Sequence, residues 1–267
     1  MTVALVAGSG RLPAILQARL GPEALLCSVE GVAAGLDRAP DMVFRLETMG
    51  SAMAEMGARG ATRVCLAGAM RRPAIDRSAI DEVSRPILER LLPELGKGDD
   101  AALRAVLSAF EAAGLTPIAA HEIAPDLLPP AGCPTRATPG PDIEADRVRA
   151  AGIVRALGAS DLGQSCVVAG GQVLAVEAAP GTDWMLDTLA GEVPGRPDGA
   201  RGLLWKAPKP GQDLRADMPA IGPETVTRAS AAGLAGIAVQ SGGVLVLDLP
   251  EVIARADAAG LFFWVAP

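Results

Sequence analysis

Short apolar runs alternate with amphipathic stretches over the first half of the chain. The run TVALVA at 2–7 ends at a Gly-Ser-Gly turn, after which apolar side chains recur at helical spacing. Runs of the same kind, each predicted to be a strand, stand at 24–29, 42–46, 63–67 and 115–120. Helical spacing predicts helices between them at 51–59, 78–92 and 100–113. Strands that alternate with helices predict an α/β fold with a mostly parallel sheet.

A proline-rich break separates this pattern from the rest of the chain. Residues 125–142 hold six prolines and no apolar periodicity, which predicts an interdomain linker. Beyond it, Gly-Gly pairs at 170–171 and 242–243 stand between strand-like runs and predict two tight hairpins. Helical patterns lie among these runs at 143–157, 183–190, 224–233 and 251–259. We therefore expect an α/β domain at 1–124, a linker at 125–142 and an α+β domain at 143–267.

The side-chain inventory excludes several kinds of catalytic site. The chain has no tyrosine and a single histidine, His121. It cannot use a tyrosine as acid or base, and it cannot form a two-histidine iron site or a Cys2His2 zinc site. Any metal ligands would be mostly oxygen atoms, which favours Mg²⁺ or Mn²⁺. The formal net charge of −7 argues against non-specific binding to nucleic acid.

The cysteines and the N-terminus give no sign of an exported protein. The four cysteines form no CxxC pair, and Cys27 and Cys65 lie in apolar runs typical of a core. The N-terminus has no basic region, and glycines and a proline interrupt its apolar run. No stretch reaches the ~18–20 apolar residues that a membrane span needs. These features predict a cytoplasmic protein and leave a peripheral membrane contact open.

Two segments that follow predicted strands could meet an anionic ligand. Gly8, Ser9, Gly10 and Arg11 form a turn between a strand and a helix, where backbone N–H groups can bind phosphate. The alternative is a tight turn that binds nothing. The second segment, AGAMRRP, places Arg71 beyond the end of a strand, and its alternative is a solvated surface arginine.

Two later segments also have a functional and a structural interpretation. Lys97 lies between two glycines and could contact phosphate. Asp100 stands at a predicted helix start, where it could bind a ligand or one of the two aspartates could cap the helix. His121 and Glu122 stand at the predicted end of a strand, and the alternative for this lone histidine is a structural role.

The segment EAAPGTDWML places polar residues before a predicted helix. Thr182 and Asp183 are therefore candidates for substrate binding. The alternative is that one of them caps the helix.

The loop KAPKPGQDLRADMPAIG at 206–222 is the most informative segment. Its prolines suppress helix and strand, and it holds two of the three lysines in the chain. The candidate substrate contacts in this loop are Lys206, Lys209, Gln212 and Arg215. Such a loop suits a metal–diphosphate, because cations bind phosphate oxygens while a carboxylate holds Mg²⁺ or water. The alternative is a solvated loop.

These segments, in this order, resemble the LpxI family of UDP-2,3-diacylglucosamine pyrophosphatases. The matching segments are VAGSGRLP, AGAMRRP, KGDDAALRAV, AHE, DLGQ, VLAVEA followed by GTDWML, KAPKPGQDLRADMPAIG and AGLAGIAV. The resemblance covers essentially the whole chain. It implies a Rossmann-like N-terminal domain followed by a distinct C-terminal domain.

The resemblance also implies a Mg²⁺-dependent reaction. Water would cleave UDP-2,3-diacylglucosamine to UMP and 2,3-diacylglucosamine 1-phosphate (lipid X), a step of lipid A synthesis at the cytoplasmic face of the inner membrane. The family's essential aspartate, in an R-x-D-x-P pattern, corresponds to Asp217, which would bind the metal or orient the water. Gln164 of the DLGQ segment joins the expected substrate contacts. The expected partners are this substrate and, transiently, the inner-membrane surface, and a homodimer is left open.

The acyl chains of such a substrate would need an apolar cleft. Leu203, Leu204, Trp205 and the run LFFWV at 261–265 are candidates for it, and the alternative for all of them is the protein core.

Two other functions stay open at this point. A Rossmann-type oxidoreductase is disfavoured because Pro13 replaces the third glycine of GxGxxG, and because the second strand has no acidic residue before Glu30 at its end. A non-catalytic protein that binds a nucleotide sugar or a lipid would carry the same segments.

Overall fold

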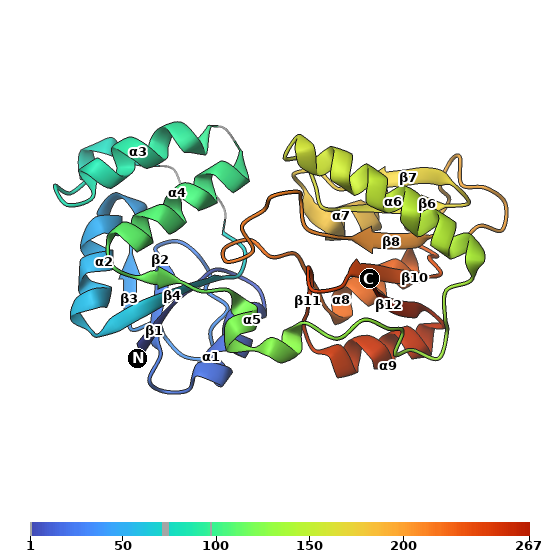
Figure 1. Ribbon diagram of the computed structural model, residues 1–267, viewed down its shortest axis with the longest axis horizontal. Coiled ribbons are helices and arrows are strands. Elements are labelled where there is room, and N and C mark those ends of the chain that lie inside the picture. Colours follow the sequence, from blue (N-terminus) through green and yellow to red (C-terminus); the bar gives the residue numbers. More distant parts are fainter. Residues whose placement is uncertain (1, 71–74, 97) are drawn as a thin grey trace. The chain divides into compact units, whose positions relative to one another are not determined.

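Figure 1 shows the computed structural model, which describes residues 2–70, 75–96 and 98–267. The chain forms two compact units. Unit 1 runs to Pro125 and also contains Asp213–Asp217, whereas unit 2 contains Asp126–Gln212 and Met218–Pro267. A short segment from the second half of the sequence therefore folds with the first half.

Unit 1 is built on a sheet in which all strand pairs are parallel. The strands stand in the order β3-β2-β1-β4-β5, with bounds Thr2–Ala7 (β1), Leu25–Val29 (β2), Met42–Phe44 (β3), Ala61–Ala67 (β4) and Thr116–Pro117 (β5). β1 and β2 are buried along nearly their whole length, as expected of parallel strands that are covered on both faces. The predicted α/β fold with a parallel sheet is confirmed.

The described residues of unit 1 form five α-helices around this sheet. They are α1 (Leu12–Leu20), α2 (Met49–Ala58), α3 (Arg85–Leu95), α4 (Asp99–Ala112) and α5 (Ala120–Ile123), with short 3-10 turns η1 (Leu46–Thr48) and η2 (Arg77–Ala79). α3 and α4 pack against each other. Large side chains fill the space between helices and sheet, among them Met53 from α2, Leu88 from α3 and Phe110 from α4.

Two predicted elements of unit 1 are wrong in part. The strand predicted at 115–120 shrinks to β5, because the chain turns into α5 at Ala120 and Glu122 Oε1 accepts the N–H of Ala119 at 2.7 Å. The helix predicted at 78–92 begins only at Arg85. Its expected first turns are replaced by a tight turn, in which Asp81 Oδ1 accepts the N–H of Ser84 at 2.6 Å.

Unit 2 contains a mixed sheet in the order β12-β10-β8-β6-β7. Its strands are Ser165–Ala169 (β6), Gln172–Val176 (β7), Leu203–Lys206 (β8), Gly236–Gln240 (β10) and Phe262–Ala266 (β12). β8, β10 and β12 are mutually parallel, and β6 runs antiparallel to both β7 and β8. A separate parallel pair is formed by β9 (Ala220–Ile221) and β11 (Leu245–Val246).

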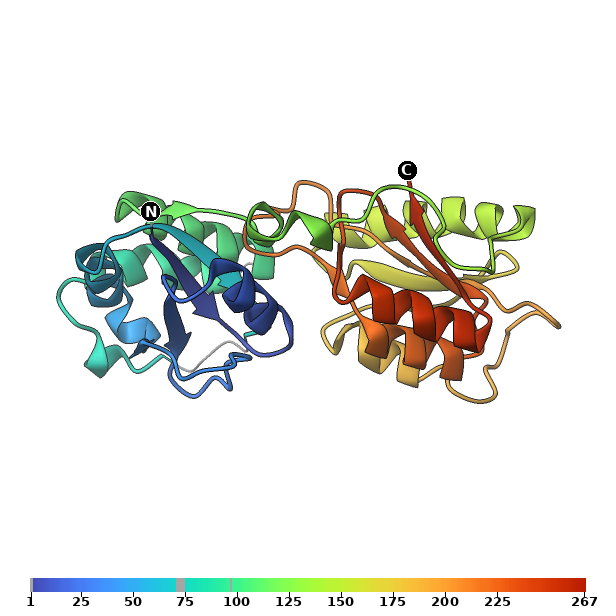
Figure 2. The same ribbon diagram turned by 90° about the horizontal axis from the view of Figure 1, so that it is seen from below.

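Helices cover both faces of the mixed sheet, as Figure 2 shows for this unit. They are α6 (Pro141–Ala159), α7 (Gly181–Asp187), α8 (Pro223–Ala231) and α9 (Leu249–Ala259), and η3 (Pro125–Leu127) precedes them. Alternate residues of β8 point to opposite faces of the sheet. Leu203 and Trp205 pack in the cluster with α6, and Leu204 packs in the cluster with α7, α8 and α9.

Only one of the two predicted hairpins exists. Gly170 and Gly171 join β6 to its antiparallel neighbour β7, as predicted. The hairpin predicted at 242–243 is wrong, because the strand after this turn, β11, pairs with β9 and not with β10. Hydrogen bonds from Leu245 N to Pro219 O and from Leu247 N to Ile221 O hold it there.

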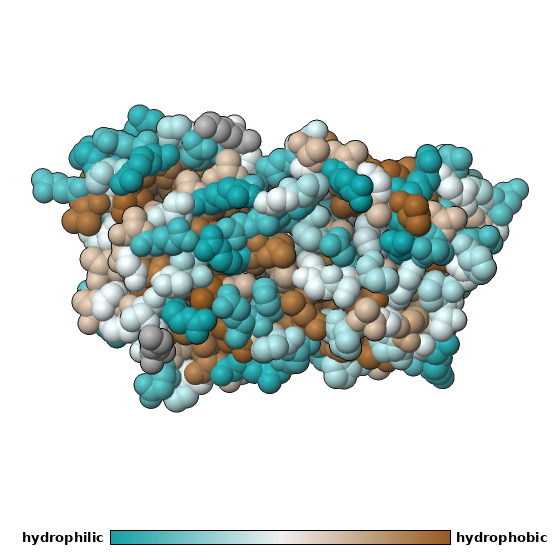
Figure 3. Space-filling view, in the orientation of Figure 1, coloured by the Kyte–Doolittle hydropathy of each residue, from teal (hydrophilic) through white to brown (hydrophobic). Residues whose placement is uncertain are grey.

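The residues considered for an acyl cleft belong to the core. Leu203 and Leu204 are fully buried, Trp205 is 3% exposed, and the strand that contains Phe263 is buried except at the half-buried Trp264. The surface shown in Figure 3 mixes hydrophobic with hydrophilic residues. Within the described ranges, no helix is both long enough and apolar enough to cross a membrane.

Candidate functional site

The glycine turn after β1 lies directly against the segment after β4. Gly8 N donates to Ala67 O at 2.7 Å, Ser9 N donates to Ala69 O at 2.8 Å, and Ala69 N donates back to Ser9 O at 2.9 Å. A Cβ at position 8 would stand 2.5 Å from Ala69 O, so only glycine fits there. Gly10 has a φ of +97° at the approach to α1. The N–H groups of Gly8 and Ser9 are thus already bonded, and a phosphate would have to compete for them.

His121 and Glu122 lie in α5 rather than at a strand end. Glu122 binds the N–H of Ala119, and its Oε2 lies 3.5 Å from Arg63 Nη2. His121 Nδ1 is buried and has no hydrogen-bond partner among the described residues. Glu122 therefore stabilises its own helix, while Nδ1 of His121 is a buried polar atom without a hydrogen-bond partner among the described residues.

Helix α4 carries charged side chains near its start. The helix begins at Asp99 with Gly98 in the N-cap position, so Asp100 does not cap it. Asp100 Oδ2 instead accepts a hydrogen bond from Arg104 Nε at 2.7 Å, and this bond raises the pKa of Arg104 above its usual range. Arg71 and Lys97, two basic candidates for contact with an anionic ligand, lie outside the described residues.

A buried polar cluster lies in unit 2, and it includes two residues that sequence reasoning selected. Lys206, at the end of β8, is 6% exposed, and its Nζ donates to Thr182 Oγ1 at 2.7 Å. Thr182 Oγ1 donates to Glu177 Oε2 at 2.9 Å, and Ser165 Oγ donates to the same oxygen at 2.5 Å. The fold thus buries one ammonium and one carboxylate on either side of a threonine hydroxyl.

The neighbouring residue Asp183 is placed differently from Thr182. α7 begins at Gly181 with Pro180 in the N-cap position, so neither Thr182 nor Asp183 caps the helix. Asp183 is exposed, and its Oδ2 lies 3.6 Å from Arg228 Nε.

The first part of the lysine loop stays in unit 2. Lys209 Nζ binds Asp161 Oδ1 at 2.5 Å, and its backbone N–H donates to Gln212 Oε1 at 2.8 Å. Gln212 Nε2 lies 3.4 Å from Gln164 Oε1. The predicted contacts Gln164, Lys209 and Gln212 therefore form one hydrogen-bonded group, with Asp161 neutralising the lysine.

The next five residues of the loop belong to unit 1. Arg215 binds both carboxylate oxygens of Asp213, from Nε at 3.0 Å and from Nη2 at 2.7 Å. Its Nη1 donates to Glu111 Oε1 of α4 at 2.8 Å. The bonds to Arg215 hold the pKa of Asp213 below its usual range, so Asp213 is ionised and is not a proton donor at neutral pH. Asp217, which is half-buried, closes this turn through its N–H to Asp213 O.

Sequence reasoning missed four polar residues of these clusters. They are Glu111, Asp161, Ser165 and Glu177. Glu177 had a usable signal, as a carboxylate directly after an apolar strand-like run, and so did Asp161, as the first residue of the DLGQ segment. Glu111 resembles any solvated helical glutamate until its partner 104 residues away is known.

No described group of three or more His, Cys, Asp and Glu side chains could by itself hold a metal ion. Asp213 is bound by Arg215, and Asp217 is the loop carboxylate that the R-x-D-x-P pattern marks as a candidate metal ligand. Mg²⁺ commonly binds through one or two carboxylates, with substrate phosphates and water as its other ligands. The residues present therefore fit a Mg²⁺ that arrives with a diphosphate, and not a dedicated protein cage.

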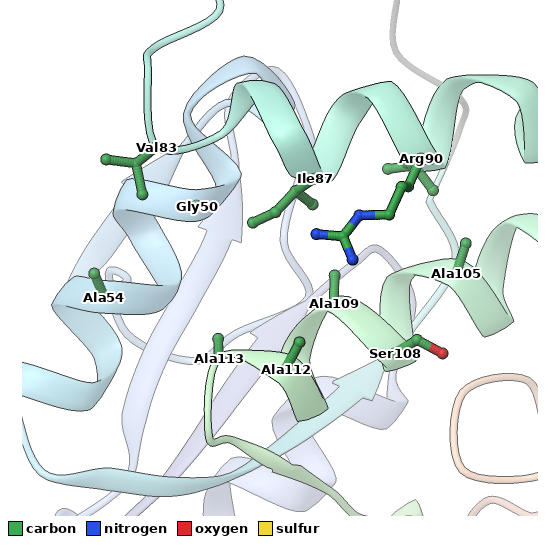
Figure 4. Close-up of a pocket in the computed structure, with 11 residues that line it drawn as sticks. Gly50, Ala54, Val83, Ile87, Arg90, Ala105, Ser108, Ala109, Ala112 and Ala113 are labelled. Carbon is green, nitrogen blue, oxygen red and sulfur yellow. The ribbon is translucent and has the colours of Figure 1, made fainter.

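A groove of about 470 Å³ lies among α2, α3 and α4 of unit 1. Its walls are mainly small apolar residues such as Ala54, Ala109 and Ala112, and the Arg90 guanidinium lies across it, as Figure 4 shows. It contains none of the predicted site residues. We therefore place the candidate site in the polar clusters and not in this groove.

Comparisons with known proteins find matches along nearly the whole chain. A family model described as LpxI N-terminal domain matches residues 2–127, and one described as LpxI C-terminal domain matches residues 130–264. A protein of Caulobacter vibrioides named UDP-2,3-diacylglucosamine pyrophosphatase LpxI is 38% identical over 265 residues, which cover 97% of this chain and 95% of that protein. The chain therefore belongs to the LpxI family.

Proposed function

We propose that this protein hydrolyses the diphosphate of UDP-2,3-diacylglucosamine to UMP and 2,3-diacylglucosamine 1-phosphate, in lipid A biosynthesis. The observation that carries the proposal is the similarity, over 97% of the chain, to a relative that is named for this pyrophosphatase activity. The side chains are consistent with it, because a buried ammonium, that of Lys206, and a candidate carboxylate, that of Asp217, stand within twelve residues of one loop. Diphosphate hydrolysis needs cations that offset phosphate charge and a carboxylate that acts on metal or water.

The residues have separate roles in the proposed reaction. Lys206 offsets negative charge on the phosphate oxygens; the described residues occupy one of its three ammonium N–H groups, through Thr182. Thr182 fixes the direction of that ammonium, because its hydroxyl is itself bound by Glu177. Asp217 orients the attacking water or binds the metal. A bound Mg²⁺ would neutralise diphosphate oxygens during the displacement.

A direct assay tests this function. Purified protein is incubated with UDP-2,3-diacylglucosamine and Mg²⁺, and UMP and lipid X are separated by chromatography. We expect both products in equal amounts, loss of activity with EDTA and recovery when Mg²⁺ or Mn²⁺ is added back. Tight binding of the substrate without any product would instead identify a non-catalytic binding protein.

The membrane contact and the homodimer remain predictions. The substrate carries two acyl chains, so we expect the protein to take it from a membrane surface. Sedimentation with phospholipid vesicles that contain the substrate, compared with vesicles that lack it, measures this contact. Sedimentation equilibrium of the purified protein measures whether it forms a dimer.

A further inference from the structure

Arg215 connects the turn that contains Asp217 to helix α4. The three guanidinium nitrogens each bind a carboxylate oxygen: Nε and Nη2 bind Asp213, and Nη1 binds Glu111 at 2.8 Å. Arg215 N also donates to Asp213 Oδ1 at 3.1 Å. Asp213 is therefore bound by both the backbone and the side chain of Arg215, and Glu111 ties this pair to the helix.

This arrangement makes Arg215 a poor partner for substrate phosphate. Two carboxylates surround one guanidinium, so the group of three side chains carries a net negative charge at neutral pH. A diphosphate that approached Arg215 would have to displace a carboxylate or stand beside an anionic group. The geometry favours a role in holding the turn rather than in binding the substrate.

Asp217 depends on the same turn for its position. The backbone N–H groups of Ala216 and Asp217 both donate to Asp213 O at 3.2 Å. Asp213 thus links Asp217 through the backbone to Arg215, and Arg215 links the turn to α4.

We propose that Glu111 is a positioning residue for the hydrolysis, because its bond to Arg215 holds the turn that carries Asp217 onto α4. This inference rests on the proposed function, in which Asp217 acts on the metal or the water. Glu111 itself touches neither substrate nor reacting atoms in this role.

The exposure of the ion pair predicts which measurement will respond. Arg215 is 40% exposed and Glu111 is 47% exposed, and ion pairs this exposed contribute little to global stability. Catalysis is far more sensitive, since a displacement of about 1 Å can cost about 100-fold in rate. Loss of Glu111 should therefore lower kcat while the unfolding midpoint and KM stay nearly constant.

A second ion pair of unit 1 provides a matched control. Glu55 Oε1 and Arg59 Nε are also 2.8 Å apart, and they are 50% and 43% exposed. This pair lies within α2 and has no part in the turn. Glu55→Ala and Glu111→Ala therefore remove equivalent ion pairs, and only the second should affect the reaction.

The kinetic test compares five variants in the UMP assay. We expect Glu111→Ala to lower kcat at least about ten-fold with KM within about three-fold. Glu111→Gln, which keeps an acceptor oxygen for Arg215, should recover most of the rate. Glu55→Ala should match the wild type, and Arg215→Ala combined with Glu111→Ala should cost no more than Arg215→Ala alone. Wild-type kcat in Glu111→Ala, or additive losses in the double variant, would overturn the proposal.

Hydrogen exchange gives a test that does not depend on activity. Amide exchange of a peptide that covers 213–217 should be at least about ten-fold faster in Glu111→Ala than in the wild type and in Glu55→Ala. Unchanged exchange would refute the positioning role, even with an active enzyme. If the wild type has no pyrophosphatase activity, the proposed function fails, and the exchange experiment still decides whether Glu111 holds the turn.

Discussion

Replacement of Lys206 by methionine removes the positive charge of a buried ammonium and nearly keeps the volume of the side chain. Lys206 Nζ and Glu177 Oε2 both bind Thr182 Oγ1, at 2.7 and 2.9 Å. At a separation of at most about 5.6 Å and an effective dielectric constant of ~20, the two charges attract each other by about 3 kcal/mol. Keeping the ammonium buried costs a desolvation free energy of similar or larger size. Because these terms oppose each other, we expect Lys206→Met to change the unfolding free energy by less than ~2 kcal/mol.

The effect of the same substitution on the reaction should be much larger. A positive charge about 4 Å from a phosphate oxygen contributes up to about 4 kcal/mol at that dielectric constant, which corresponds to as much as about 1000-fold in rate. We expect kcat/KM for UDP-2,3-diacylglucosamine to fall by at least about 100-fold. Urea unfolding and the UMP assay on the same preparation measure both quantities. Activity within about three-fold of the wild type in a folded variant would refute the proposal that the Lys206 ammonium stabilises the substrate phosphates.

Three further predictions concern local geometry, pH and thiol chemistry. Gly8→Ala should destabilise the protein by about 1–3 kcal/mol in urea unfolding, because the new Cβ would meet Ala69 O. Gly57→Ala should be neutral or slightly stabilising, because its Cβ would meet no atom within 4 Å beyond the adjoining backbone of its own helix. The hydrogen bonds from Arg45 hold the pKa of Glu47 at about 2 against the opposing effect of burial, so its contribution to the unfolding free energy is complete above about pH 4.5 and is lost as pH falls towards 2. Unfolding measured between pH 5 and 3 should be less pH-dependent in Glu47→Gln than in the wild type. A thiol reagent at pH 8 should label the half-buried Cys133 first, because burial raises the pKa of the other three thiols to about 12; equal labelling of all four in the native state would contradict this.

Local patterns were sufficient for most of the fold. The apolar run at 2–7 became β1, and the Gly-Gly pair at 170–171 became a hairpin, since both depend on residues close in sequence. The pair at 242–243 has the same appearance, but its outcome depends on β9, a strand of two residues more than 20 positions earlier. Such a short strand leaves almost no pattern in the sequence, so the competing pairing was not predictable.

The sequence predicted several residues of the polar clusters, but it predicted few of the contacts among them. Lys206 and Thr182 were chosen separately, and the fold joins them at 2.7 Å. Glu177 was missed because a carboxylate after a strand is usually solvated, and only the packing around it shows that it is buried. Arg215 was expected to bind phosphate, and its two carboxylate partners appear only in three dimensions.

The central claim is that Asp217 is required for hydrolysis of a diphosphate. Asp217→Asn keeps the shape of the side chain and removes its charge. Single-turnover UMP formation with Mg²⁺ and saturating enzyme measures the chemical step in wild type and variant. We expect a rate at least about 100-fold lower in Asp217→Asn, with unchanged circular dichroism and unfolding midpoint. UMP formation at the wild-type rate in the folded variant would contradict it.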